Sequence, residues 1–187
     1  MHVLEHPLVV DADRFATAAH AAIGQLEKFT GLPYSEHTRA VARLVATCIN
    51  RHEVVAAAHL HDVIEDPKVP KLVLVDRFGV VVGDMVDEVS RKATPEMGNR
   101  AARVAFEVKR IAGISSDGKS IKCSDVTVNV SCIVERDPKF ARVYVPEKRV
   151  LMTSLVGAHP ELYALAEEAV SRAELDLRGL FGRRPRP

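Results

Sequence analysis

The chain has 187 residues, enough for one globular domain with a substantial buried core. Its 26 lysine and arginine residues nearly balance 25 aspartate and glutamate residues, so the formal net charge is +1. A charge this close to zero excludes general electrostatic attraction to nucleic acid or to an anionic membrane, so any anionic ligand must be held by local groups.

Cysteine content and apolar segments indicate a cytoplasmic protein. Cys48, Cys123 and Cys132 are odd in number and lack zinc-finger or C-x-x-C spacing, so we expect reduced thiols and no disulfide. The N-terminus lacks the basic and apolar regions of a signal peptide. The longest apolar segment, residues 71–89, is interrupted by charged side chains and cannot span a bilayer.

Helical periodicity dominates the sequence, and short proline and glycine breaks separate the periodic segments. Asp11 or Asp13 is expected to cap the first helix, and the second is expected to start near Ser35 after a tight turn. Pro67 and Pro70 each lack a backbone donor, so the third helix must stop before them. The first half of the chain is therefore predicted to form five helices, at about residues 11–29, 35–50, 52–66, 71–78 and 80–91.

The second half of the chain gives less definite signals. Pro95 suits the first position of a helix that continues through residues 98–113, and residues 115–119 (SSDGK) have the composition of a loop. Residues 121–135 are ambiguous, because their β-branched side chains favour a strand while the neighbouring segments are helical. Two further helices are expected, at about residues 147–158 and 159–175.

These elements predict an all-α fold with a single domain of about eight to ten helices. No segment has the length or composition of an interdomain linker, so the domain is expected to span residues 1–180. A short basic tail, residues 181–187, follows it. A short exposed basic terminus is more often a solubilising or frayed end than a binding arm.

The segment AHLHDVIEDP concentrates histidines and carboxylates beside an apolar run. His61 and Glu65 are four residues apart, as are Asp62 and Asp66, so both pairs share a broad polar face of the expected helix. The preceding residues VVAAA indicate a helix with little solvent-facing surface. Carboxylates are rarely buried there unless they are paired or bind a cation, so this face is a candidate site.

Adjacent histidine and aspartate side chains offer one nitrogen and one oxygen to a single ion, a set that suits Mn²⁺, Fe²⁺ or Zn²⁺ better than Ca²⁺. Two ligands are too few, and His37 and Asp125 are the candidates for the others. Glu65 and Asp66 remain available to orient or deprotonate water. His59 lies roughly 200° around the helix from the HD pair and is expected to face elsewhere.

Five blocks of sequence surround these residues: FATAAH (15–20), GLPYSEH (31–37), AAAHLHDVIED (56–66), FGVVVGDMVDEVS (78–90) and KCSDVTVN (122–129). In this order they resemble the hydrolase domain of the RelA/SpoT enzymes, which are HD-domain phosphohydrolases. The H…HD…D signature, the ED pair and an asparagine four residues after the last aspartate all occur at the spacing of that family. The resemblance extends over about residues 12–175 and implies a single-domain HD-type helical bundle that acts as a stand-alone small alarmone hydrolase.

The resemblance also implies a reaction and a set of roles. The family removes pyrophosphate from the 3′ position of guanosine 3′,5′-bispyrophosphates ((p)ppGpp) with Mn²⁺, leaving GDP or GTP. By resemblance, the metal ligands are His37, His61, Asp62 and Asp125, and the residues that activate water are Glu65 and Asp66. The implied substrate-binding residues are Asn129, Lys28 and Tyr144, with Lys122, Arg142 and Lys148 as weaker candidates.

Two other functions are compatible with the same residues. One is an HD phosphohydrolase of another nucleotide, such as the 2′-phosphate of NADPH or a nucleoside monophosphate. The other is a catalytically silent module that binds a nucleotide and signals through a partner, although such a module need not retain carboxylates that activate water. In each case we expect a small nucleotide ligand, no nucleic acid and no membrane partner, and the sequence leaves the oligomeric state open.

Overall fold

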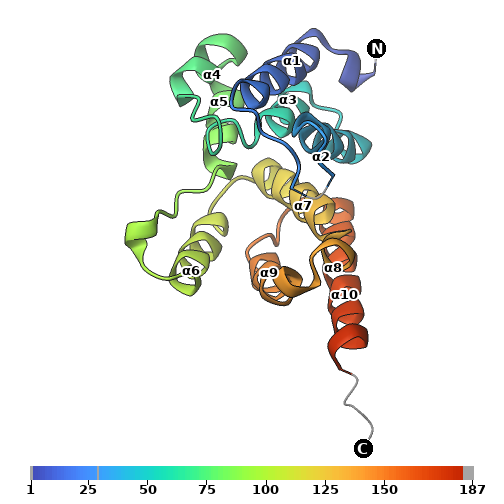
Figure 1. Cartoon of the computed structure of the whole chain (residues 1–187). Coiled ribbons are helices and arrows are strands. Elements are labelled where there is room, and N and C mark those ends of the chain that lie inside the picture. Colours follow the sequence, from blue (N-terminus) through green and yellow to red (C-terminus); the bar gives the residue numbers. More distant parts are fainter. Residues whose placement is uncertain (1, 29, 183–187) are drawn as a thin grey trace, which may run out of the picture.

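The computed structural model describes residues 2–28 and 30–182, which form ten α-helices and two short 3-10 helices (Figure 1). Apart from one isolated bridge between Leu26 and Pro33, these residues contain no strand, which confirms the predicted all-α fold of eight to ten helices. No helix in the described ranges is long and apolar enough to cross a membrane. The α-helices are α1 (Pro7–Ala22), α2 (Ser35–Cys48), α3 (His52–Leu60), α4 (Lys71–Phe78), α5 (Val80–Val89), α6 (Arg100–Ile111), α7 (Ser116–Val130), α8 (Ile133–Arg136), α9 (Pro138–Met152) and α10 (Pro160–Phe181), and the 3-10 helices are η1 (Val3–Glu5) and η2 (Pro95–Met97).

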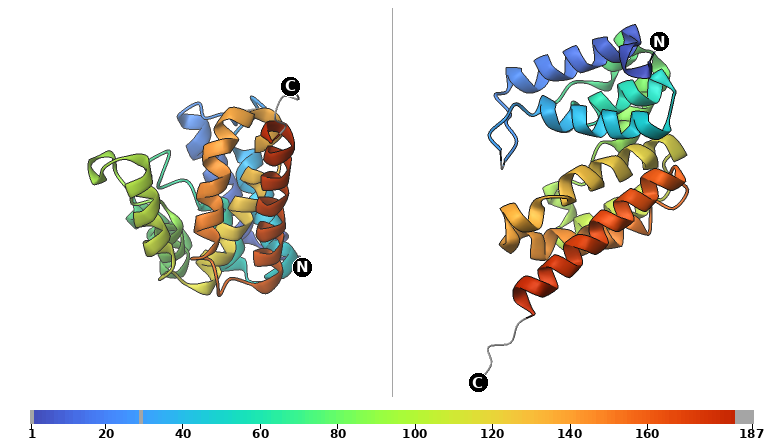
Figure 2. Two further views of the ribbon diagram at one scale, coloured as in Figure 1. Left: turned by 90° about the horizontal axis from the view of Figure 1, so that it is seen from below. Right: turned by 90° about the vertical axis from the view of Figure 1, so that its right-hand side faces the viewer.

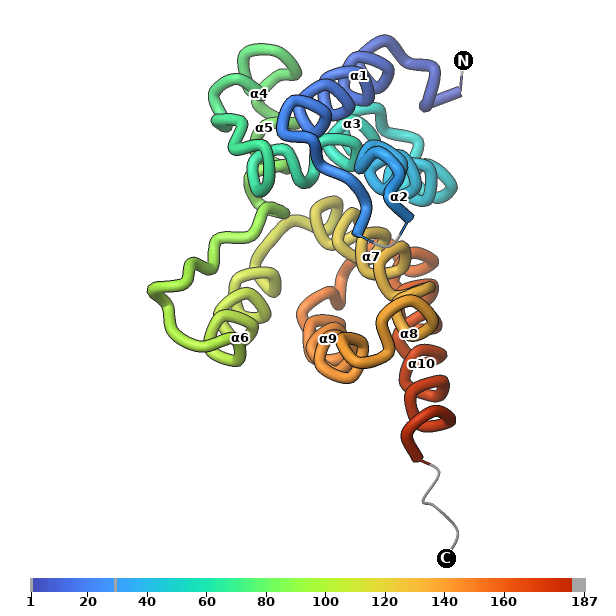
Figure 3. Tube along the Cα trace, viewed as in Figure 1, coloured from blue at the N-terminus to red at the C-terminus, as the bar shows by residue number. Residues whose placement is uncertain are grey.

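The helices are arranged in two layers that meet at α7. Helix α3 packs against α1, α2 and α5 in the N-terminal layer, and its residues Val54–Leu60 are all buried. Helix α7 packs against α2 and α5 on one side and against α10 on the other, while α9 also packs against α10 (Figure 2). Helix α6 lies at the edge of the molecule, contacts α9 and is reached from α5 through an extended segment (Figure 3). The layers therefore place residues from α2, α3 and α7 close together.

The first helix starts earlier than the sequence predicts. It begins at Pro7 because His6 is its N-cap, with the Nδ1 atom of His6 accepting a hydrogen bond from the N–H of Leu8 at 3.3 Å. Asp11 and Asp13, the predicted caps, instead form ion pairs with arginines of α4 and α2. Histidine is not a favoured capping residue, so the sequence rules select the wrong position.

The third helix ends at Leu60, earlier than the predicted Asp66. Tight turns follow: the N–H of Val63 donates to the carbonyl of Leu60 at 3.0 Å, and the N–H of Glu65 donates to the carbonyl of Asp62 at 3.1 Å. The HD and ED pairs therefore lie on tight turns that follow the buried residues Val54–Leu60. This position lets their side chains point toward α7.

The predicted loop at residues 115–119 is wrong, because this segment is the first turn of α7. Ser115 is the N-cap, and its hydroxyl accepts a hydrogen bond from the N–H of Gly118 at 3.0 Å. A Cβ at Gly118 would lie 2.4 Å from the Glu88 carboxylate, so the glycine allows α5 to approach α7 closely. The ambiguous segment after it is helical, because its apolar residues, including Ile121 and Val126, are buried between the two layers.

The C-terminal helices also differ from their predicted boundaries. Helix α9 begins at Pro138, where the predicted helix began near residue 147, and it contains Pro146 in its interior. Pro146 is exposed, so water can bond the carbonyl group that loses its helical partner.

The division into a domain at residues 1–180 and a basic tail stays a prediction, and residues 183–187 lie outside the described residues.

Replacing Leu162 with alanine tests the packing of α10 on the core. Leu162 is fully buried, so Leu162→Ala is expected to lower the free energy of unfolding by about 2–5 kcal/mol, because it removes buried methyl groups and leaves a cavity. Leu175→Ala is the matched control on the same helix; its side chain is 64% exposed, and we expect a change within about 0.5 kcal/mol. Urea denaturation measures both, and equal losses would contradict this packing.

Candidate metal and catalytic site

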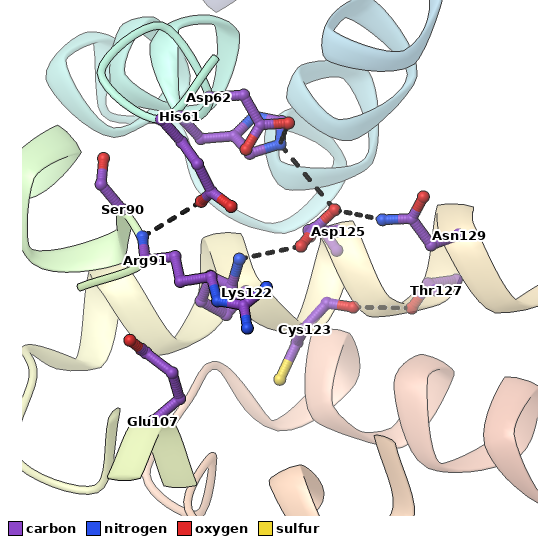
Figure 4. A network of polar contacts seen from close by, with 12 residues as sticks. His61, Asp62, Ser90, Arg91, Glu107, Lys122, Cys123, Asp125, Thr127 and Asn129 are labelled. Carbon is purple, nitrogen blue, oxygen red and sulfur yellow. Dashed lines mark hydrogen bonds and ion pairs between the residues drawn. The ribbon is translucent and has the colours of Figure 1, made fainter. Parts of the chain in front are cut away.

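The four predicted metal ligands converge where α7 packs against α2 and α3. His37 lies in the first turn of α2. His61 and Asp62 lie in the turn after α3, and Asp125 lies in the middle of α7 (Figure 4). The Nε2 atom of His61 is 3.3 Å from that of His37 and 3.1 Å from Oδ2 of Asp62. The Oδ1 atom of Asp125 is 3.4 Å from Nε2 of His37 and 3.8 Å from Nε2 of His61.

These separations fit donor atoms that share one divalent metal ion. Atoms bound about 2.1 Å from the same ion lie roughly 3.0–3.4 Å apart at octahedral and tetrahedral angles. The ligand atoms of His37, His61 and Asp62 all lie within 4.8 Å of one another. Two imidazole nitrogens beside two carboxylates form a mixed donor set typical of sites for Mn²⁺, Fe²⁺ or Zn²⁺, so the residues fit such an ion.

Hydrogen bonds orient these ligand side chains. The Nδ1 atom of His61 lies 2.8 Å from the carbonyl oxygen of Ala58, so Nδ1 donates and Nε2 faces the cluster. The side chain of Asn129 donates to Oδ1 of Asp125 at 2.5 Å, and Nζ of Lys122 donates to Oδ2 of Asp125 at 2.9 Å. Each partner lies one helical turn from Asp125 on α7.

The charges of the cluster hold a proton on His61. Burial lowers the pKa of His61, but the carboxylates of Asp62 and Asp125 outweigh burial and raise this pKa to about 9. Burial also lowers the pKa of Lys122, yet the surrounding carboxylates raise it above its ordinary value. Burial raises the pKa of Asp125, but Lys122 and the histidines hold it well below its usual range. A metal ion must therefore displace the proton of His61.

Glu65 and Asp66 line the cavity next to the ligands. Oε2 of Glu65 accepts a hydrogen bond from the N–H of Arg91 at 3.1 Å, and burial raises the pKa of Glu65 although Lys122 acts in the opposite direction. Oδ2 of Asp66 accepts a hydrogen bond from the side chain of Gln25 at 2.7 Å. Both carboxylates are thus oriented by groups outside their own turn.

A cavity of about 350 Å³ opens beside the ligands. Its lining contains six acidic and six basic side chains, so a divalent ion would leave it with an excess of positive charge. Such a cavity suits an anionic ligand. The acidic residues are Asp62, Glu65, Asp66, Glu107, Asp125 and Glu147, and the basic residues are Arg91, Arg100, Arg103, Arg110, Lys122 and Lys148.

The structure brings some of the predicted substrate-binding residues to this cavity and not others. Asn129, Tyr144 and Lys148 line it, and burial lowers the pKa of Lys148. Lys28 is not among the lining residues of the described chain; its ammonium group lies 2.9 Å from Asp137. Arg142 is also outside the lining, and its guanidinium group lies over the ring of Phe181.

His59 lies away from the ligands, as its position in the helix indicates. Its Nδ1 atom is 3.6 Å from Oδ1 of Asp13 on α1. Burial lowers the pKa of His59 to about 4 although Asp13 acts in the opposite direction, so the ring is neutral at physiological pH.

Two groups of residues at this site were not predicted from the sequence. The hydroxyl of Tyr34 donates to Oδ2 of Asp62 at 2.6 Å, and the position of Tyr34 inside the GLPYSEH block was an available signal. Helix α6 contributes Arg100, Arg103 and Arg110 to the cavity. Their spacing of three and seven residues places them on one face of a helix, which could have indicated a basic wall.

Comparison with known proteins identifies the family. Residues 12–135, more than half of the chain, match the HD domain family. The chain belongs to the HD domain family. The convergence of His37, His61, Asp62 and Asp125 agrees with this membership, since the H…HD…D residues form one cluster.

Curated relatives of this HD domain are larger proteins. A guanosine-3′,5′-bis(diphosphate) 3′-pyrophosphohydrolase from Haemophilus influenzae is 29% identical over 175 residues, covering 82% of this chain and 26% of the relative. A protein of the same name from Vibrio cholerae is 43% identical over 77 residues, covering 41% of this chain and 11% of the relative. The chain thus spans about a quarter, or less, of the length of these relatives.

Solved structures share the fold of this HD domain. A metazoan ortholog of SpoT, described as hydrolysing ppGpp, superposes with a TM-score of 0.80 at 22% identity, covering 90% of this chain and 97% of that chain. A protein of Listeria monocytogenes EGD-e superposes with a TM-score of 0.61 at 20% identity, covering 83% of this chain and all of that chain. At these identities the likeness shows the fold.

The proton on His61 makes metal binding depend on pH. The histidine is protonated below a pKa of about 9 and must be neutral to bind a metal, so the apparent affinity for Mn²⁺ is expected to rise up to about tenfold per unit from pH 6.5 to 8.5. Isothermal titration calorimetry in buffers of different ionisation enthalpy measures affinity and proton release together.

A matched pair of variants controls this measurement. His61→Asn is expected to lose tight binding, while His52→Asn, at a half-exposed histidine of α3, is expected to bind as the wild type does. An affinity that does not change with pH over this range would contradict the proton on His61.

Proposed function

We propose that this HD domain is a metal-dependent hydrolase of guanosine 3′,5′-bispyrophosphates. The reaction is attack of water on the phosphorus bound to the 3′ oxygen, which breaks the P–O3′ bond and releases pyrophosphate and GDP or GTP. We further propose that Mn²⁺ is the metal and that the protein acts in the cytoplasm in alarmone turnover. The assignment of His37, His61, Asp62 and Asp125 as its ligands is part of this proposal.

The observation that carries the proposal is the combination of the ligand cluster and the adjoining cavity. A substrate with two pyrophosphate groups is strongly anionic, and the cavity combines a cation site with basic side chains from α6, α7 and α9. The names of the two curated relatives support the choice of substrate. The metazoan ortholog of SpoT that shares this fold is described as hydrolysing ppGpp, which also favours this substrate.

The roles of the site residues follow from their placement. When bound, a divalent cation polarises the phosphoryl oxygens and lowers the pKa of water. Glu65 accepts a proton from the attacking water, and the raised pKa of its buried carboxyl group makes it a stronger base than an exposed glutamate. Asp66, fixed by Gln25, orients the water. Lys122, beside both Asp125 and the cavity, compensates phosphoryl charge in the transition state.

Further residues of the cavity bind the nucleotide in this proposal. The side chain of Asn129 bonds Asp125 and also reaches the cavity, so it can contact the ribose or the 3′ phosphate. Tyr144 also lines the cavity, and the ammonium group of Lys148 lies 4.7 Å from the centroid of its ring. Lys28 remains a proposal from the family resemblance, since its ammonium group bonds Asp137.

The product distinguishes this substrate from other nucleotides. Incubation of the protein with Mn²⁺ and ppGpp is expected to release pyrophosphate, measured by an enzyme-coupled assay that separates it from orthophosphate. NADPH and nucleoside monophosphates, which can yield only orthophosphate from a single phosphate group, are the comparison substrates. Orthophosphate release from one of these, with no pyrophosphate from ppGpp, would overturn the proposed substrate.

Removing the carboxylates that activate water tests catalysis. The double substitution Glu65→Gln and Asp66→Asn is expected to lower kcat by about 10²–10⁴-fold, because the amides cannot accept a proton from water, while Mn²⁺ affinity stays within a few fold. Glu168→Gln, at an exposed glutamate of α10, is the control and should leave kcat unchanged. Unchanged turnover in the double variant would contradict these roles, and a wild-type protein that binds ppGpp without turnover would indicate a silent binding module.

A further inference from the structure

The Glu65 carboxylate accepts a hydrogen bond from a backbone segment that is distant in sequence. The N–H of Arg91 donates to Oε2 of Glu65 at 3.1 Å. Arg91 lies in residues 90–93, which leave the end of α5 in an extended conformation with Ser90 at ψ 139°. An extended segment has no helical hydrogen bonds of its own, so other groups must fix the position of the Arg91 N–H.

Two side chains of α6, those of Glu107 and Arg110, form hydrogen bonds with the backbone on either side of Arg91. Oε1 of Glu107 accepts from the N–H groups of Lys92 and Ala93, both at 2.7 Å. The guanidinium group of Arg110 donates to the carbonyl oxygens of Glu88 at 2.6 Å and Ser90 at 3.1 Å. Four backbone groups on both sides of Arg91 are therefore bound by one pair of side chains.

The two side chains also bind each other. Nε and Nη2 of Arg110 donate to Oε2 of Glu107 at 2.9 and 2.7 Å. The Glu107 side chain is 15% exposed and that of Arg110 is 19% exposed, so the ion pair is largely screened from solvent. Both Arg110 donors bind the same oxygen, which leaves Oε1 of Glu107 for the backbone N–H groups. Helix α6 packs against α9 and η2, and this pair of side chains attaches it to residues 88–93. Figure 4 shows Glu107 on the same side of the site as Ser90 and Arg91.

We infer that Glu107 and Arg110 are positioning residues for hydrolysis, acting on Glu65 through the N–H of Arg91. The inference rests on the proposed function, in which Glu65 accepts a proton from water. It connects the base to α6, which also carries Arg103 at the cavity. The connection runs through hydrogen bonds at every step, from α6 to residues 90–93 and from there to the carboxylate.

The expected effect is on turnover and not on binding. A base displaced by about 1 Å can lose as much as 10²-fold in rate. Glu107 and Arg110 also line the cavity, but their polar groups bind each other and residues 88–93, so the other basic side chains of the lining are left to bind the substrate. The metal ligands do not contact Glu107 or Arg110 through any hydrogen bond or ion pair among the described residues. Metal affinity is therefore expected to stay the same when the pair is altered.

Glu107→Gln is the test variant. Its amide offers one acceptor and one donor, so whichever way it turns it cannot accept from both the backbone N–H groups and Arg110. We expect kcat for ppGpp to fall about tenfold or more, with KM and Mn²⁺ affinity within about twofold. Glu96→Gln, at an exposed glutamate of η2, is the matched control and should leave kcat unchanged. A rise in KM at unchanged kcat would overturn the inference.

A double-mutant cycle separates positioning from a general loss of structure. In the Glu65→Gln background, adding Glu107→Gln is expected to cause no further loss of the residual rate, because the residue it positions is already absent. The same fractional loss in both backgrounds would overturn the inference, since it would show an effect that does not pass through Glu65.

Amide hydrogen exchange supplies a readout that needs no substrate. The N–H groups of Arg91, Lys92 and Ala93 are expected to be protected in the wild type and to exchange at least tenfold faster in Glu107→Gln, while amides in α7 keep their protection. Unchanged exchange at Arg91 would overturn the inference whatever the activity. A wild-type protein that releases no pyrophosphate from ppGpp would overturn the proposed function instead, and the exchange data would still decide whether Glu107 fixes this segment.

Discussion

The buried carboxylate of Asp125 is the group on which the arrangement of this HD domain depends. It lies on the helix shared by the two layers, and it meets the histidines of α2 and α3 on one side and Lys122 on the other. A buried charge is costly unless it is paired, and here the pairing partners come from both the same helix and the opposite layer. Packing of α7 against α2 and α3 therefore brings together the four side chains of the candidate metal site.

The need to bring pairing partners to the buried Asp125 also explains why α3 is so apolar. Its residues Val54–Leu60 are all buried, which places the following turn, with His61 and Asp62, inside the protein. The carbonyl of Ala58 then orients the His61 ring, and Tyr34 orients Asp62. On the far side of the cavity, α6 is attached through polar contacts and not through a large apolar face. The ligands are thus held by the rigid core, while the basic wall and the support of Glu65 depend on hydrogen bonds.

Much of this site could be predicted from the sequence, because its ligands follow local patterns. The HD and ED pairs are close together in sequence, and His37 and Asp125 lie in blocks that resemble those of the RelA/SpoT hydrolase domain. The boundaries of α1, α7 and α9 could not be predicted, since they depend on a histidine cap, on the approach of Glu88 to Gly118 and on the exposure of Pro146. Nor could the role of α6 be predicted, because Glu107 and Arg110 act on backbone groups that become neighbours only in the folded chain.

We propose that one divalent ion is bound jointly by side chains of α2, of the turn after α3 and of α7. Diffraction from crystals grown with Mn²⁺, recorded on both sides of the manganese absorption edge, tests it most directly. The claim predicts one anomalous peak per chain, bound by His37, His61, Asp62 and Asp125, which disappears in crystals of Asp125→Asn. The absence of a peak at this cluster, or a peak bound by other residues, would contradict it.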